Sequence, residues 1–242
     1  MALTHQPDLR RRFAPGTSAR PLAVAGALVA AVVAVIVVIA TAGPHEGPSA
    51  STDGSGVSVT DQREVAPFTE VELAGANTVL IHIGMPLSVA VTGDDNLVGR
   101  VTTVVRAGRL VIDNTDSFTT QAPMHVAVSV PSLDAVKLSG AGTATVDGVT
   151  GVKFSADLAG DGTLVASGTV QGVTAVLAGA GTLDLHDLLA VDATAQLPGT
   201  GTIRVHATST LEATLTGTGT ILYRGDPTVT MHNTGTGTVA PE

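Results

Sequence analysis

Five residues that can carry chemistry stand at one position of a repeated pattern in the second half of the chain. Each lies four places after a threonine that ends a Gly-x-Gly-Thr motif; they are Asp147, Ser167, His186, His206 and Arg224. If neighbouring repeats lie one above the other, His186 and His206 come close enough to share a metal ion, with Asp187 beside them. Because these imidazoles have no evident third ligand, the alternative is a solvated outer face. We assign no metal-binding residue and call this set the polar column.

Two acidic turns in the first half have the composition of calcium sites. The first contains Asp94, Asp95 and Asn96, and the second contains Asp113, Asn114 and Asp116. Neither run has the ligand spacing of a calcium-binding loop, and such side chains commonly bond to the backbone of their own turn. We therefore predict turns here, and we assign no cofactor to the chain.

Catalytic motifs are equally hard to assemble from this sequence. Cleavage of a polysaccharide needs paired carboxylates that face one groove, and aligning the repeats places no two acidic residues next to each other in one column. Aromatic residues, which stack on sugars, make up 2% of the chain. No serine stands in a Gly-x-Ser-x-Gly nucleophile elbow. We assign no catalytic residue.

The repeats determine which elements must position the polar column. Six copies of Gly-x-Gly-Thr begin 18 to 20 residues apart, at Gly140, Gly160, Gly179, Gly199, Gly217 and Gly235. Val, Thr, Ala, Leu and Ile alternate loosely between them, which favours strands, and a period this short is typical of a solenoid. The predicted fold class is all-β, a β-solenoid or parallel β-helix-like stack with coils of 18–20 residues, preceded by one N-terminal transmembrane α-helix.

Aligned copies predict columns of like residues. A leucine precedes the first glycine by two places in five copies, at Leu138, Leu158, Leu177, Leu197 and Leu215. We expect these leucines to point inward, and Asn233 in the sixth copy to cap the stack. The glycines fit corners that need positive φ or close backbone approach, and the motif threonines fit a ladder. Lys137 beside Asp157, and Asp184 beside Arg204, would then form outward charge pairs.

Residues 59–135 also read as short strands separated by turns. The segment LAGANT from Leu73 is a worn copy of the motif, with Asn77 where the second glycine would stand. The same solenoid can therefore begin here.

The N-terminal region predicts a membrane segment. Leu22 to Ala40 contains no charged residue, and a helix of that length reaches roughly 29 Å, close to a hydrocarbon core. Four arginines precede it, which places residues 1–21 in the cytoplasm as a basic arm. We expect a transmembrane helix at 22–42, a flexible linker at 43–58 and an extracytoplasmic solenoid at 59–240. The alternative is a signal segment cleaved after Ala42, which would make the protein secreted.

Net charge and cysteine content exclude one class of partner and one class of chemistry. Beyond residue 21 the chain carries eight basic and twenty acidic residues, a balance that excludes nucleic acid as the expected partner. Cysteine is absent, which excludes disulfides and thiolate chemistry. The chain therefore depends on packing of small aliphatic side chains.

Several local patterns together resemble one family. They are the approach from Arg63 to Phe68, GDDNL from Gly93, a Gly-Arg-Leu turn at Gly108, and VPSLDAVKLSGAGT from Val130. In this order they resemble the putative auto-transporter adhesin head GIN domain, also called DUF2807, over about residues 59–240. The resemblance implies a β-solenoid on an exported or anchored bacterial protein, and it transfers no functional residues.

We therefore expect a membrane-anchored, extracytoplasmic, non-enzymatic binding or structural protein of the bacterial cell envelope. Its partner would be an envelope protein or a polysaccharide, and the sequence leaves the oligomeric state open. The alternatives are a carbohydrate-active enzyme on the same scaffold and an envelope-stress sensor that signals through residues 1–21.

Overall fold

The computed structural model describes residues 52–242. The predicted basic arm at 1–21, the transmembrane helix at 22–42 and the linker up to residue 51 lie outside the described residues. Across the described part, the single helix is a 3-10 turn, η1 (Val98–Arg100), and none is long and apolar enough to cross a membrane.

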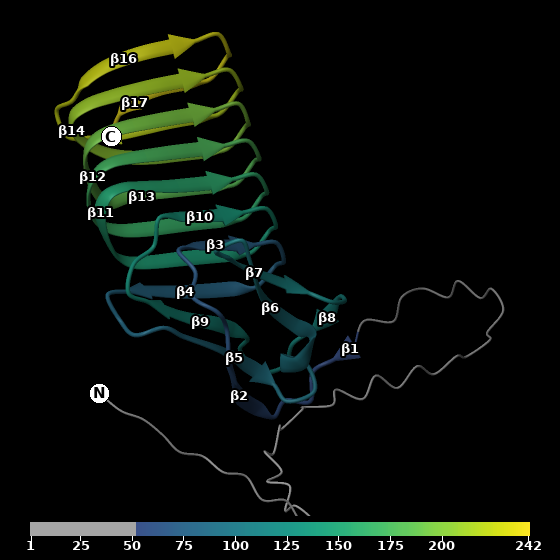
Figure 1. Cartoon of the computed structure of the whole chain (residues 1–242). Helices are drawn as coiled ribbons and strands as arrows, with labels where there is room; N and C mark the ends of the chain where they lie inside the picture. Colours follow the sequence, from purple (N-terminus) through teal and green to yellow (C-terminus); the bar gives the residue numbers. More distant parts are fainter. Residues whose placement is uncertain (1–51) are drawn as a thin grey trace, which may run out of the picture. The chain divides into compact units, whose positions relative to one another are not determined.

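The second half of the chain is a parallel β-solenoid. Its strands are β10 (Ala135–Leu138), β11 (Thr143–Leu158), β12 (Thr163–Leu177), β13 (Thr182–Leu197), β14 (Thr202–Leu215), β15 (Thr220–Arg224), β16 (Thr228–Asn233) and β17 (Thr238–Pro241). Each long strand bends once and returns, and a short corner then leads to the next coil (Figure 1). All the pairings among these strands are parallel, so the predicted all-β solenoid is confirmed.

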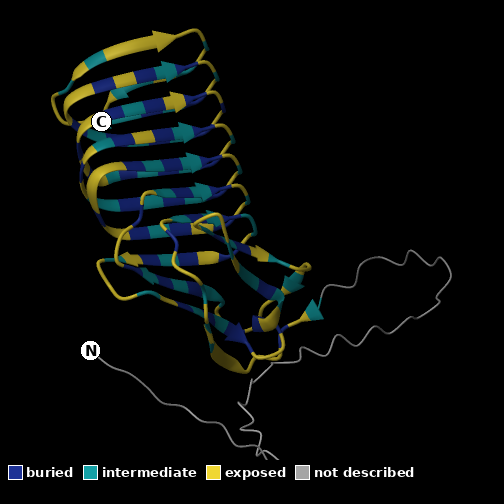
Figure 2. Cartoon of the chain, in the orientation of Figure 1, coloured by how far each residue is buried: buried dark blue, intermediate teal, exposed yellow. Residues whose placement is uncertain are grey.

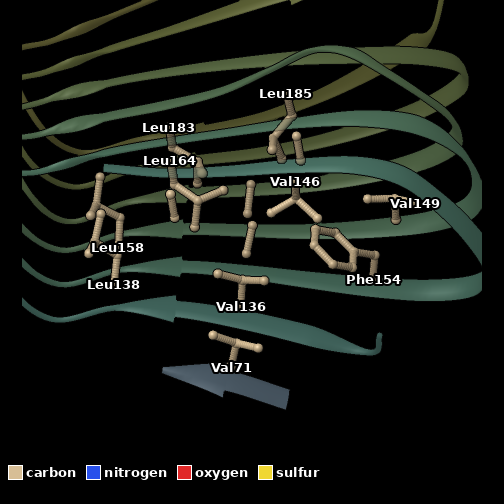
Figure 3. Close-up of a cluster of buried hydrophobic side chains, with 14 of the residues drawn as sticks. Val71, Val136, Leu138, Val146, Val149, Phe154, Leu158, Leu164, Leu183 and Leu185 are labelled. Carbon is tan, nitrogen blue, oxygen red and sulfur yellow. The ribbon is translucent and has the colours of Figure 1, made fainter. Parts of the chain in front are cut away.

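Leucines stack on leucines, as the repeat predicts. Leu158 lies opposite Leu138 on one side and Leu177 on the other, and all three are almost completely buried. Figure 3 shows Leu138 and Leu158 on adjacent coils, with Phe154 packed in the same interior. On both sides of each corner of the long strands β11 to β14, buried positions alternate with more exposed ones (Figure 2). Full burial of a leucine contributes about 1.5–3 kcal/mol, so this column is a main source of stability.

Glycine is required at the corners because backbones approach closely there. A Cβ on Gly160 would clash with the carbonyl oxygen of Gly140, and a Cβ on Gly162 would lie 2.8 Å from a methyl group of Leu138. Neither glycine is among the residues with positive φ. Of the two reasons that the sequence offers, close approach is therefore the correct one.

The last corner is closed by Asn233, which lies opposite Leu215. Its Oδ1 accepts a hydrogen bond from the N–H of Gly235 at 3.0 Å, and its Nδ2 donates to the carbonyl of Gly237 at 3.3 Å. The side chain therefore serves its own corner and leaves the leucine column, as expected of a cap.

The first half combines solenoid strands with antiparallel hairpins. Its strands are β1 (Thr52–Asp53), β2 (Ser58–Arg63), β3 (Glu70–Leu73), β4 (Thr78–Ile83), β5 (Ser88–Asp94), β6 (Val101–Arg106), β7 (Arg109–Asn114), β8 (Phe118–Thr119) and β9 (His125–Val130). The antiparallel pairs are β2 with β5, β5 with β9 and β6 with β7. The prediction of β structure throughout is therefore confirmed, but its pairing is more complex than a plain stack.

The worn motif at Leu73 forms the corner of the first regular coil. Leu73 pairs with Leu138 and Thr78 pairs with Thr143, in the same register as later coils. Below this coil, β7 pairs with β3 and β9 pairs with β4, all in parallel. An irregular layer that contains β7 and β9 therefore closes the start of the solenoid.

Residues 52–58, which the sequence assigns to the linker, are attached to the domain. Thr52 and Asp53 pair with Phe118 and Thr119, and the carboxylate of Asp94 accepts hydrogen bonds from N–H groups of Gly56, Gln121 and Ala122. Burial alone would raise the pKa of Asp94, but these backbone donors outweigh it and hold that pKa below its usual range. Asp94 therefore ties remote segments together as well as serving its own turn.

The two predicted charge pairs differ in outcome. Arg204 Nη1 lies 3.2 Å from Asp184 Oδ2, as expected. Lys137 lies opposite Asp157 in the ladder, yet its ammonium group bonds to Glu72 on the other side, at 2.9 Å. The hydrogen bond from Lys137 holds the pKa of Glu72 below its usual range, whereas burial raises the pKa of Asp157.

Candidate functional site

The first half of the polar column forms a short network. His82 of β4 lies opposite Asp147 of β11, and Nδ1 of His82 is 3.7 Å from Oδ2 of Asp147. Ser167 of β12 donates its hydroxyl to Oδ1 of Asp147 at 3.0 Å. More than half of the His82 and Asp147 side chains is exposed. The network therefore lies on the outer surface of three successive coils.

These are the residue types of a serine-hydrolase relay, in a different order. In such a relay the imidazole stands between the hydroxyl and the carboxylate, and removes the proton from the hydroxyl. Here the carboxylate of Asp147 stands between Ser167 and His82, so the serine bonds to a weak base. In this arrangement the hydroxyl of Ser167 bonds to the carboxylate and not to the imidazole.

The second half of the polar column keeps the predicted stacking of His206 opposite Arg224 but departs from it at His186. His206 lies opposite Leu189 of β13, because the register shifts between Leu185 and Leu189, and residues 186–188 form a bulge there. His186 bonds through Nδ1 to Asp187 Oδ1 and through Nε2 to Arg224 Nη1, both at 2.9 Å. The prediction that His186 and His206 stack one coil apart is wrong because the bend accommodates different numbers of residues in successive coils.

Charged groups surround His186. Arg204 bonds to Asp184 and approaches Glu242, whose carboxylate also lies 3.9 Å from Nε2 of His186. Since Arg224 can only donate, its contact requires Nε2 of His186 to accept, and Nδ1 then donates to Asp187. Within residues 52–242, no three His, Asp or Glu side chains gather closely enough to hold a metal ion.

A cavity of about 720 Å³ lies in the irregular first half. Its walls are residues 76–77 of the first corner, Thr78 at the start of β4, residues 114–118 from the last residue of β7 onward, and Thr120 and Met124. Asn77 is 5% exposed, and its Nδ2 donates to Oδ1 of Asn114 at 2.7 Å. Asp116 accepts hydrogen bonds from Arg100 at 2.9 Å and Thr115 at 3.2 Å. The site is therefore lined with amide, hydroxyl and carboxylate groups.

Chain length explains why this cavity exists. The connection from β3 to β4 has four residues, 74–77, as in the regular corners, whereas the connection from β7 to β9 in the layer below has ten, 115–124. In later coils each corner rests directly on the one before it. At Asn77 the longer connection, residues 115–124, does not pack directly against the shorter one, residues 74–77. The cavity is the space between these two connections.

Sequence reasoning missed this site, although three of its residues, Asn77, Asn114 and Asp116, were singled out for other reasons. Asn77 is the one departure from Gly-x-Gly-Thr at the first corner, and Asn114 belongs to an acidic turn considered for calcium. The sequence holds no signal that brings residues 77 and 114 together, because β7 pairs below β3 without being its neighbour in the chain. A motif residue that changes from glycine to a polar side chain was the available signal.

Comparison with known proteins places this geometry in a family. Residues 67–227 match the family model described as "Putative auto-transporter adhesin, head GIN domain". No curated protein matches the chain.

Solved structures share the fold. A putative adhesin from Bacteroides fragilis is similar with a TM-score of 0.64 and 19% identity, and the match covers 79% of this chain and 100% of that one. A putative adhesin from Parabacteroides distasonis is similar with a TM-score of 0.51 and 20% identity, covering 80% of this chain and 100% of that one. At these identities the likeness establishes the fold alone.

Proposed function

Because this chain belongs to the putative auto-transporter adhesin, head GIN domain family, we propose that it is a non-enzymatic binding protein of the bacterial cell envelope. It is held at the outer side of the membrane by the apolar segment at residues 22–40 and presents its solenoid to an envelope polymer or protein. The two solved structures described above are likewise named as adhesins.

The observation that supports this proposal is the continuous ladder of strands. From β7 through β3, β10 and on to β14, one parallel sheet runs through the domain, with its register shifted only at bulges in the long strands. Stacked coils of this kind bury a shared core and present long exposed faces, which suit binding of extended partners. The outward side chains on these faces are mainly Thr, Ser and charged residues.

The polar column favours binding over catalysis. The hydroxyl of Ser167 bonds to the Asp147 carboxylate, and His186 is engaged by Asp187 and Arg224. Each of these groups is therefore placed to make hydrogen bonds rather than to deliver a reactive nucleophile. A carbohydrate-active enzyme remains the rival, and purified full-length chain incubated with envelope polysaccharides decides between them: released oligosaccharides would contradict our proposal.

The side of the membrane on which each region lies is tested with single-cysteine variants. Because the chain contains no cysteine, a thiol reagent labels only the introduced residue. Thr200→Cys lies at an exposed corner of the solenoid, and Thr17→Cys lies in the basic arm. We expect a membrane-impermeant thiol reagent to label the first variant on intact cells and the second only after lysis. Labelling of Thr17→Cys on intact cells would contradict the proposed topology.

Binding is tested by a screen of the full-length chain against envelope proteins and glycans. Asp147→Ala and His186→Ala remove the two centres of the polar column, and Glu212→Ala, an exposed acidic residue, is the matched control. If the column contributes, the first two variants weaken binding about tenfold, as expected for the loss of a charged hydrogen bond. Absence of any partner in the screen would contradict the binding function itself.

A further inference from the structure

We propose that the cavity beneath the first corner binds a neutral carbohydrate. This inference rests on the proposed binding function and names its ligand class and its site. The residues that carry it are Asn77, Asn114, Asp116, Ser117, Phe118 and Thr120.

The cavity has the size of a small-molecule site. Its volume of about 720 Å³ lies within the ~300–1,000 Å³ that is usual for ligand pockets. It arises where the chain departs from its own repeat, so neighbouring coils do not fill it as they fill the regular corners. Rigid elements hold both sides, since β3 and β4 are paired to the solenoid above and to β7 and β9 below.

Two side-chain amides, one in the first corner and one at the end of β7, line this site together. Asn77 is almost fully buried, and a hydrogen bond of 2.7 Å from its Nδ2 to Asn114 Oδ1 fixes both groups. Within residues 52–242, Oδ1 of Asn77 and Nδ2 of Asn114 have no hydrogen-bond partner, although both side chains line the cavity. An acceptor and a donor side by side match adjacent hydroxyl groups of a sugar, each of which donates and accepts.

The charge of the site favours a neutral ligand. Arg100 Nη1 and Thr115 Oγ1 both donate to Oδ2 of Asp116, so the nearby cation is already paired. Oδ1 of Asp116 is left as an acceptor for a ligand hydroxyl, and the hydroxyls of Ser117 and Thr120 supply further donors and acceptors. An anionic ligand would meet the Asp116 carboxylate without a free cation to offset it.

An aromatic ring completes the chemistry. The described part of the chain contains three phenylalanines; Phe68 and Phe154 are buried in the core, whereas Phe118 is partly exposed and lines the cavity together with Met124. The apolar C–H face of a sugar ring packs against such a surface while its hydroxyls reach the polar wall. Tyr223, on the regular coils, is the other partly exposed aromatic residue among residues 52–242, and it does not line the cavity.

The test uses full-length chain on an array of neutral and acidic oligosaccharides, followed by calorimetric titration of the neutral oligosaccharides that bind. Asn77→Gly restores the glycine of the motif, and Phe118→Ala and Asp116→Asn remove the ring and the carboxylate. Asn233→Gly in the last corner and Asp161→Asn at a regular corner are the matched controls. Thermal unfolding of each variant confirms that it is folded.

We expect the unmodified chain to bind a neutral oligosaccharide, each cavity variant to lose about tenfold or more in affinity, and both controls to bind as the unmodified chain does. Neutral binding that survives all three cavity changes, or binding of acidic oligosaccharides or proteins alone, overturns this inference while the proposed function stands. A chain that binds neither glycans nor envelope proteins overturns both.

Discussion

Residues 135–242 and residues 58–134 share one large sheet, from which only β8 of this range is separate, yet the two regions pair their strands differently. In the later region every strand pairs with the strand one repeat away, and the register is kept on both sides of each corner and shifts only at bulges in the long strands. In the earlier region β7 and β9 are inserted below β3 and β4, and three antiparallel pairs interrupt the parallel order. The regular region fills its own corners with backbone, whereas the irregular region leaves a polar cavity.

This difference determines where a cavity for a small ligand can form. A repeat that packs corner on corner has no room for a ligand at those corners, and its stability comes from stacking. A binding cavity requires a departure from the repeat, which is found where the ten-residue connection lies under the four-residue one. Substitutions in each region can test whether close packing of corners and leucines stabilises the regular region and whether individual polar contacts hold the irregular one.

The largest effect is expected from Gly160→Ala in the regular region. Its methyl group would meet the carbonyl oxygens of Gly140 and Ser139, which belong to rigid backbone. We expect a loss of about 4 kcal/mol or more in the free energy of unfolding, measured with chemical denaturant. In the control, Gly99→Ala, the new methyl meets no atom within 4 Å. Equal stability of the two variants would show that the corners are not closely stacked.

Leu177→Ala comes next, because it removes one layer of the leucine column. Leu177 is completely buried between neighbouring coils, which cannot close the gap. We expect a loss of about 3 kcal/mol by denaturant unfolding. Leu189→Ala, at a position 37% exposed, should cost only about 0.5 kcal/mol. A small cost at Leu177 would contradict the solenoid core.

Asp94→Asn tests the irregular region. The amide would turn an N–H donor toward backbone N–H groups that now donate to the carboxylate, so residues 52–57 should become accessible to protease and the melting temperature should fall. Asp226→Asn, at an exposed position in the solenoid half, is the control. Retained protease resistance in Asp94→Asn would show that this carboxylate does not fasten the segment.

The same carboxylate predicts a pH dependence. Because the pKa of Asp94 in the folded state lies below its ordinary value of 3.8, the ionised group stabilises the fold above that pH. This stabilisation is lost as the pH falls through the folded-state pKa, and Asp94→Asn should lack this part of the acid sensitivity. Melting curves of both proteins between neutral pH and pH 3 measure it; parallel curves would contradict the assignment.

The smallest effect is expected from the ion pair of Asp184 with Arg204 on the solenoid surface. The two side chains are 29% and 37% exposed, so solvent screens their attraction. A double-mutant cycle with Asp184→Asn and Arg204→Gln should give a coupling of about 0.5 kcal/mol that decreases in high salt. A coupling of several kcal/mol would mean that surface charges contribute to stacking as much as leucines do.

The regular region could be predicted from sequence because repetition makes distant contacts visible. Leu138, Leu158 and Leu177 lie at equal intervals, and translating one coil onto the next is enough to place them. The same reasoning failed at His186 and His206, because the bend between the two sides of a coil absorbs insertions without disturbing the core register. Position counted from a motif is reliable only until the first bulge.

The candidate site could not be predicted because its residues do not belong to the repeating pattern. Asn77 and Asn114 meet only because β7 pairs below β3, and that pairing is neither local nor part of the repeat. The contacts of Asp94 could not be predicted for the same reason. Its backbone partners at Gly56 and Ala122 are far from it in the sequence, one before it and one after it. Contacts of this kind require the fold to be known first.

Nuclear magnetic resonance tests most directly whether the cavity binds a neutral oligosaccharide. A neutral oligosaccharide selected on the array is titrated into isotope-labelled full-length chain, and the backbone amide shifts are followed. We expect changes in amide shift to be concentrated at residues 74–78 and 114–124, and the amide shifts around Asp147 and His186 to stay constant. Changes concentrated along the regular coils, with the amide of Asn77 unmoved, would contradict this expectation.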